Sequence, residues 1–196
     1  MIAANDNAAR LTPEQYLVWE ETQPDKHEYI DGRVYAMSGG SVNHGRIALR
    51  LTTLLDTHLE GSDRITGNSD IKVKIAAAQN YTYPDASVTC DDRDQQTPQY
   101  ITYPCLVVEV LSAGTEAYDR GGKFRLYRQN PVLQDYLLIS STKIEMDLYH
   151  KTQADDWVII NYQPGDTIEL SSIGLSFAIE HVYRGLTLTP DCQRTI

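Results

Sequence analysis

Residues 104–112, PCLVVEVLS, place one acid, Glu109, among five valine and leucine side chains. A run of this composition, which begins with proline and leads into Ser-Ala-Gly, is typical of a strand buried on both faces of a sheet. Glutamate is seldom fully buried unless it is paired with a cation or bound to a metal. Glu109 therefore predicts either a metal site or an ion pair at the end of this strand.

The length and composition predict a globular protein. The chain has 196 residues, of which 41% are hydrophobic and 22% charged, enough for one domain with a substantial core. A net charge of −10 argues against a positively charged coat for tight non-specific binding to nucleic acid, although a local basic groove remains compatible with it. Because the N-terminus shows no export signal and no apolar stretch reaches about 18 residues, we expect a cytoplasmic protein without a membrane segment.

The three cysteines, Cys90, Cys105 and Cys192, are widely spaced, odd in number and without a CxxC pair. This pattern fits a reducing compartment better than a disulfide framework or a zinc site. We interpret the cysteines as core residues.

The remaining patterns predict one α/β domain with a strand-rich C-terminal half. Thr12, Pro13 and Gln15 form a capping box that begins a helix, and Asp31-Gly32 is a hairpin turn. A second helix runs from about residue 43 to Gly61, with an apolar stripe at helical spacing. Residues 91–103 read as a loop, 115–130 as a helix and 177–185 as a closing helix. The expected strands are 64–68, 69–76, 83–90, 104–111, 135–140, 143–150, 157–163 and 166–170.

Asp85, in a second short strand that begins with proline, is the candidate partner of Glu109. Two neighbouring strands would bring both carboxylates to one end of a sheet, where like charges raise at least one pKa. A hard divalent cation such as Mg²⁺ removes that penalty, because it prefers carboxylate oxygens and water. The pair therefore predicts a metal site that would polarise a phosphodiester and acidify an attacking water.

Positive charge follows 14 residues after Glu109, at Lys123 in the stretch DRGGKFRLYR. A lysine close to a metal site would orient water or stabilise the charge that develops on phosphorus oxygens. Three arginines of the same segment are candidates for holding flanking phosphates of a substrate: Arg120, Arg125 and Arg128.

Each of these residues also has a simpler interpretation. Glu109 can be an ion pair at a strand end, Asp85 a turn-capping aspartate, and Lys123 half of a surface salt bridge with the aspartate four residues before it. His44 can be a polar residue of a first helical turn, and Glu28 an exposed strand residue beside a turn. Only their joint order along the chain favours a site.

That order resembles the Uma2 family of restriction-endonuclease-like proteins, in the PD-(D/E)XK nuclease superfamily. The resemblance spans about residues 11–188 and rests most on the PD of YPDASVTC, the EVLS of the opening strand and the DRGGKF segment. It implies a restriction-endonuclease-like α+β fold with a mixed central β-sheet flanked by helices. The further matching stretches are HEYIDGRVYAM (27–37), NHGRIALRLTTLL (43–55) and DYLLIS (135–140).

The resemblance also implies roles for individual residues. Asp85 matches the metal-binding aspartate, and Glu109 matches the acid of the (D/E)XK motif. Leu111 stands where the superfamily pattern has lysine, and the resemblance implies that Lys123 takes its place. Glu28 and His44 match recurrent family positions and are carried over as supporting residues of the metal or substrate shell. The family further implies Mg²⁺ or Mn²⁺ as cofactor and a homodimer.

Two functions from different classes follow. The first is a metal-dependent endonuclease acting on DNA, in a single nuclease-like domain over residues 11–190, after a loose leader (1–10) and before a short tail (191–196). The second is a nuclease-like domain that no longer cuts and binds nucleic acid or a protein partner, which the missing strand lysine and the acidic charge favour. A ribonuclease or a nuclease for special structures such as flaps is a third reading.

Overall fold

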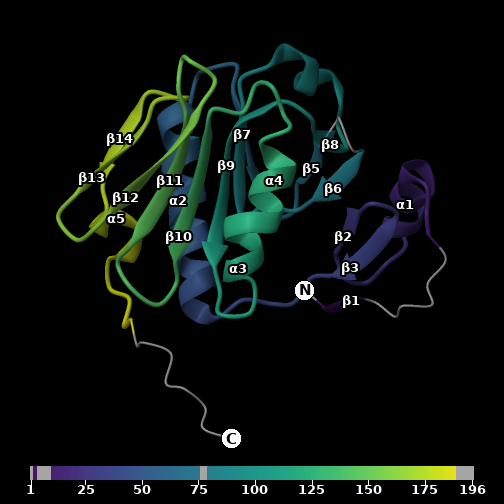
Figure 1. Ribbon diagram of the computed structural model, residues 1–196, viewed down its shortest axis with the longest axis horizontal. Coiled ribbons are helices and arrows are strands. Elements are labelled where there is room, and N and C mark those ends of the chain that lie inside the picture. The colour runs from purple at the N-terminus through teal and green to yellow at the C-terminus, as the bar shows by residue number, and fades with distance from the viewer. Residues whose placement is uncertain (1, 4–9, 76–78, 189–196) are drawn as a thin grey trace, which may run out of the picture.

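A mixed six-stranded sheet forms the centre of the protein (Figure 1), a computed structural model that describes residues 2–3, 10–75 and 79–188. Its strand order is β12-β11-β10-β9-β7-β4, in which β9 and β10 are parallel and the other neighbours antiparallel. The strands are β4 (Ile65–Asn68), β7 (Ala86–Thr89), β9 (Pro104–Leu111), β10 (Asp135–Ser140), β11 (Met146–Lys151) and β12 (Trp157–Tyr162).

The opening strand of the sequence, β9, lies inside this sheet, between β7 and β10. All eight of its residues are buried, as its composition predicts. Helix α2 (Val42–Leu59) covers one face, where Val108 and Val110 share a core with the helix residue Leu51. On the other face, Val107 and Leu111 pack in a second core below α4 (Phe124–Tyr127). Because side chains alternate along a strand, Glu109 belongs to the α4 face with Val107 and Leu111.

A second six-stranded sheet, in the order β1-β3-β2-β6-β5-β8, lies beside the central one (Figure 1). Its β2–β3 hairpin turns at Asp31 and Gly32, both with positive φ, as the Asp-Gly sequence predicts. Its strands are β1 (Ile2–Ala3), β2 (His27–Ile30), β3 (Arg33–Ala36), β5 (Lys72–Ile75), β6 (Asn80–Thr82) and β8 (Tyr100–Ile101).

The structure confirms the first two predicted helices and the positions at which they begin. Helix α1 (Pro13–Glu20) begins with the predicted capping box between Thr12 and Gln15. Helix α2 begins after Ser41, whose side chain accepts a hydrogen bond from the amide of His44. The predicted helix over 115–130 is divided into α3 (Glu116–Tyr118), a π-helical turn (Asp119–Lys123) and α4.

Two predictions about local structure were wrong. The expected loop over 91–103 contains a 3₁₀ helix (Asp92–Gln96) and β8. The expected helix over 177–185 begins as a strand, β14 (Leu175–Ala178), paired with β13 (Thr167–Leu170), and only α5 (Glu180–Tyr183) is helical. Buried Leu175 and Phe177 alternate with exposed neighbours, so the period of two outweighs helix propensity there.

The expected loose leader (1–10) also differs from the structure in part. Ile2–Ala3 forms β1, which pairs with β3, whereas residues 4–9 lie outside the described residues. The predicted tail (191–196), the last residue of the predicted strand over 69–76 and Cys192 also lie outside them. None of the helices in the described ranges combines the length and hydropathy that a membrane span requires.

Candidate functional site

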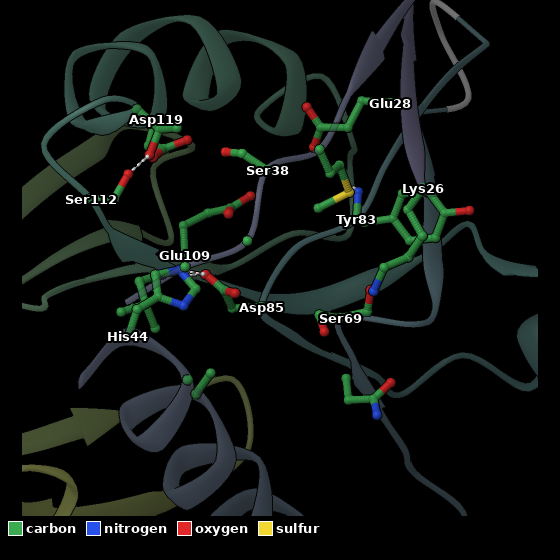
Figure 2. Close-up of a pocket in the computed structure, with 18 of the residues that line it drawn as sticks. Lys26, Glu28, Ser38, His44, Ser69, Tyr83, Asp85, Glu109, Ser112 and Asp119 are labelled. Carbon is green, nitrogen blue, oxygen red and sulfur yellow. Dashed lines mark hydrogen bonds and ion pairs between the residues drawn. The ribbon is translucent and has the colours of Figure 1, made fainter. Parts of the chain in front are cut away.

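The pairing of β7 with β9 brings the two predicted acids together. Ala86 lies opposite Val108 in this antiparallel pair, so Asp85, one residue before β7, lies at the level of Glu109. The carboxylate of Asp85 is fixed to β9, because its Oδ2 accepts a hydrogen bond of 2.7 Å from the amide of Val110. Asp85 and Glu109 both line a cavity of about 610 Å³ (Figure 2). The structure therefore places both acids at one cavity wall.

Lys123 reaches this cavity from the helical segment on the α4 face. Its Nζ lies 2.9 Å from Oε1 of Glu109 and 3.0 Å from Oε1 of Glu28, and its residue is 7% exposed. The lysine is the last residue of the π-helical turn, and such turns are frequent at functional sites because they redirect side chains. Lys123 is thus a buried cation in contact with the site. The ion pair with Asp119 that the sequence also allowed is present at 3.7 Å, but it is buried and does not lie on the surface.

Glu28 and Asp119 complete the surroundings of Lys123. Glu28, on β2, is 2% exposed and also accepts a hydrogen bond from the amide of Tyr83. Asp119 is 2% exposed, with Oδ1 3.7 Å from Nζ of Lys123. Burial on its own would lower the pKa of Lys123, but the three carboxylates around it raise this pKa well above the usual value. Lys123 therefore carries its charge at neutral pH.

Burial dominates the electrostatics of the acids. It raises the pKa of Glu109 well above its usual value; Lys123 opposes this shift, and the charges of Asp119, Asp85 and Glu28 add to it. Burial also raises the pKa of Asp119, again against the effect of Lys123. Five carboxylates (Asp25, Glu28, Asp85, Glu109 and Asp119) thus line the same cavity as two lysines, Lys26 and the buried Lys123, and the excess of acidic groups favours a cation.

One oxygen of each predicted metal ligand is free to bind such a cation. Oε1 of Glu109 accepts hydrogen bonds from Lys123 and from the hydroxyl of Tyr127, and Oδ2 of Asp85 faces the amide of Val110 and the ring of His44. In the part of the chain that the structure describes, Oε2 of Glu109 and Oδ1 of Asp85 accept no hydrogen bond. These two oxygens fit a hard divalent ion.

The described residues contain no group of three or more His, Cys, Asp or Glu side chains arranged to hold a metal by themselves. Mg²⁺ does not require such a group, since it usually keeps several waters and binds one or two carboxylates together with substrate phosphates. The donor set of Asp85 and Glu109 is therefore of the open type that suits Mg²⁺ or Mn²⁺.

His44 lies on the other side of Asp85, in the first turns of α2. Its Nε2 is 3.3 Å from Oδ2 of Asp85 (Figure 2). Burial lowers the pKa of His44, but the hydrogen bond and the charge of Asp85 outweigh it, so the net pKa is raised. His44 thus lies at the cavity wall in contact with Asp85, and its role as a supporting residue stays a prediction.

The three predicted substrate-binding arginines do not line the cavity. Arg120 forms ion pairs with Glu116 and Asp147, whereas Arg125 and Arg128 are exposed on or just after α4. Of the three arginines, only Arg120 has carboxylate partners in this structure. The role of all three at flanking phosphates stays a prediction.

Sequence reasoning missed two residues of the site, Asp119 and Tyr127. The hydroxyl of Tyr127 lies 3.0 Å from Oε1 of Glu109 and 2.9 Å from Oγ1 of Thr82. Both missed residues are four positions from Lys123, so helical spacing would have placed all three on one face. That signal was available, since the sequence already predicts a helix over 115–130.

The fold defines a class of protein, the restriction-endonuclease-like proteins, which have a mixed central sheet flanked by helices. A crystal structure described as "a putative nuclease belonging to DUF820", from Anabaena variabilis ATCC 29413, matches with a TM-score of 0.65. The match covers 88% of this chain and 97% of that one, at 15% sequence identity, and shows the similarity of fold.

The chain belongs to the Uma2 family. The family model described as "Uma2: Putative restriction endonuclease" matches residues 13–180. The "Uncharacterized protein slr1290" of Synechocystis sp. is 63% identical over 188 residues, which cover 95% of this chain and 99% of the relative. A second Synechocystis protein, "Uncharacterized protein sll1609", is 32% identical over 151 residues, or 76% of this chain and 85% of the relative. Family and fold together indicate a restriction-endonuclease-like nuclease.

Proposed function

We propose that the protein is a divalent-metal-dependent endonuclease that hydrolyses phosphodiester bonds of DNA. Asp85 and Glu109 would hold Mg²⁺ or Mn²⁺, and Lys123 would balance charge at the reacting phosphate. One observation carries the proposal: each acid keeps a free carboxylate oxygen at a cavity that also receives a buried, charged lysine. When bound there, the metal would supply Lewis-acid chemistry, by polarising the phosphate and acidifying a water.

The chain's own residues would bind and orient the substrate. The ammonium of Lys123 is held by Glu28 and Glu109 and points toward the same cavity as the free oxygens. A fixed cation in a buried site stabilises developing negative charge without the reorganisation that water would need. Glu28 and Asp119 act as positioning residues, because they keep the lysine charged and in place.

His44 would handle a proton at the edge of the site. Its ring nitrogen Nε2 lies beside Oδ2 of Asp85, whose hydrogen bond and charge raise the pKa of His44 and so favour its protonated form. From this position it would donate a hydrogen bond or a proton to an oxygen of the phosphate or the leaving group.

Nicking of supercoiled plasmid with Mg²⁺ or Mn²⁺ tests the proposal. We expect metal-dependent nicking by the wild type, and a loss of at least about 100-fold in Asp85→Asn and in Glu109→Gln, which keep the side-chain shape but remove the charge. Glu169→Gln, at an exposed position of β13, is the matched control and should retain activity. Nicking that is undiminished in both site variants would refute the assignment of the acids.

The second candidate is a nuclease-like domain that binds without cutting. Leu111 occupies the strand position of the superfamily lysine, and it packs in the apolar core on the α4 face. Calorimetry separates the two functions: if neither Mg²⁺ nor Mn²⁺ binds and DNA affinity survives Asp85→Asn, binding without catalysis is favoured. A panel of single-stranded, flap, duplex and RNA substrates then distinguishes a nuclease for duplex DNA from a ribonuclease or a nuclease for special structures such as flaps.

The predicted homodimer has a candidate surface at β12. This strand lies at the edge of the central sheet and carries three consecutive exposed aliphatic residues: Val158, Ile159 and Ile160, which are 41%, 56% and 38% exposed. An apolar edge strand offers unpaired backbone groups to another strand, and a second copy would cover it. The homodimer and the cytoplasmic location stay predictions.

A further inference from the structure

Two of the cysteines meet where β7 and β9 run side by side, at the end opposite to the acids. Cys90 follows the last residue of β7, and Cys105 is the second residue of β9. Their sulfur atoms lie 2.7 Å apart, although 14 residues separate them in the sequence. We propose that Cys90 and Cys105 are a redox-active pair that forms a reversible disulfide between β7 and β9.

The two thiols differ in a way that suits stepwise oxidation. Cys90 is exposed, so its interpretation as a core residue was wrong, and it can meet a small oxidant. Cys105 is 5% exposed, and its thiol donates to the carbonyl of Val88. Burial, together with the contact to Cys90, raises the pKa of the Cys105 thiol, so this group remains protonated and unreactive toward reagents in solution. Cys90 would therefore react first with the oxidant, and Cys105 would act as the resolving thiol.

The chemistry is a thiol–disulfide exchange with a low-molecular-weight disulfide such as oxidised glutathione. The Cys90 thiolate attacks one sulfur of the reagent, which forms a mixed disulfide and releases one glutathione thiolate. Cys105 then loses its proton and attacks Sγ of Cys90, which closes the protein disulfide and releases the second glutathione. The protein loses two electrons and two protons, and the reagent disulfide is reduced to two thiols.

The disulfide would close residues 91–104 into a loop and join the two strands that carry Asp85 and Glu109. Neither cysteine lines the cavity, so oxidation leaves the cavity wall intact and acts on the stability of the strand pair. A loop of about this length is expected to raise Tm by about 5–10 °C on oxidation. This inference does not depend on the nuclease activity.

Peptide mapping provides the test. The full chain is incubated under native conditions in buffers of varied ratios of reduced to oxidised glutathione, alkylated, denatured and digested with trypsin without reductant. Cleavage after Lys74, Arg93 and Arg120 places the two cysteines in separate peptides, residues 75–93 and 94–120. We expect these peptides to be linked in the wild type and in Cys192→Ser, to separate with dithiothreitol, and to remain unlinked in Cys90→Ser.

Two further measurements make the result decisive. The rise in Tm should be absent in Cys90→Ser, which changes an exposed residue and preserves the fold. In Cys105→Ala, a glutathione adduct on Cys90 should accumulate, because its resolving thiol is gone; if this variant does not fold, Cys90→Ser still decides. Any of three results with the wild type would overturn the proposal: a glutathione adduct on Cys90 without a linked peptide, no oxidation at all, or a disulfide between Cys90 and Cys192.

Discussion

Replacement of Lys123 by methionine is the perturbation to which the site should respond most strongly. The change keeps most of the side-chain volume but removes the charge that Glu28, Glu109 and Asp119 share. Removing one partner of a buried ion pair leaves an uncompensated charge, which typically costs about 3–5 kcal/mol. Since a domain is stable by only about 5–15 kcal/mol, Lys123→Met should fold but lie close to the limit.

The loss should depend on pH, and its sign follows from the raised pKa values. Burial raises the pKa of Glu109 and of Asp119 above their unfolded values. Such carboxyls contribute stability that is present below the unfolded pKa and is lost as pH rises through the folded pKa. Without Lys123 the folded pKa values rise further, so the penalty of the variant should be largest near pH 8 and smaller near pH 5.

Urea unfolding followed by circular dichroism at pH 8 and pH 5 measures both effects. Lys143→Met is the matched control, because the side chain of Lys143 is 60% exposed, and its variant should change the free energy of unfolding by less than about 0.5 kcal/mol. If Lys123→Met lowers the free energy of unfolding by less than about 1 kcal/mol, or by the same amount at both pH values, the reasoning from a buried, uncompensated charge is refuted.

Three further predictions concern a hydrogen bond of the site, the edge strand β12 and the metal. Tyr127→Phe removes the hydroxyl that contacts Glu109 and should lower the free energy of unfolding by about 1–3 kcal/mol in urea; no measurable change would contradict that contact. Ile159→Lys should shift a dimer to monomer in size-exclusion chromatography with light scattering, and a wild-type monomer or an unaffected dimer would count against β12. Mg²⁺ should raise Tm of the wild type, reversibly with chelator, and leave Asp85→Asn unchanged; equal shifts in both would place the ion elsewhere.

Much of the fold could be predicted from local signals that need few long-range contacts. The capping box at Thr12 and the Asp31-Gly32 turn fix elements through their own hydrogen bonds and φ angles. The apolar run of β9 predicts a strand buried on both faces, which the structure confirms. The strand β14 was missed because its period of two extends over only four residues, next to a helical turn.

The sequence predicts which residues belong to the site from their order along the chain, but it does not predict which of them are in contact. The approach of Asp85 to Glu109 follows from the register of β7 and β9, which no local pattern specifies. The contacts of Lys123 depend on Glu28 and Glu109, which other strands bring to it from distant parts of the sequence. The burial of Glu28 depends on the second sheet, since β2 pairs with β3 and β6.

A crystal soaked in Mn²⁺ tests the central claim most directly, because anomalous scattering identifies the ion without any assumption about substrate. The proposed function predicts an anomalous peak bound by Asp85 and Glu109, with Lys123 beside it, and no such peak in Glu109→Gln. A peak at other residues, or no peak in the wild type at millimolar Mn²⁺, would contradict the metal site and with it the proposed nuclease mechanism.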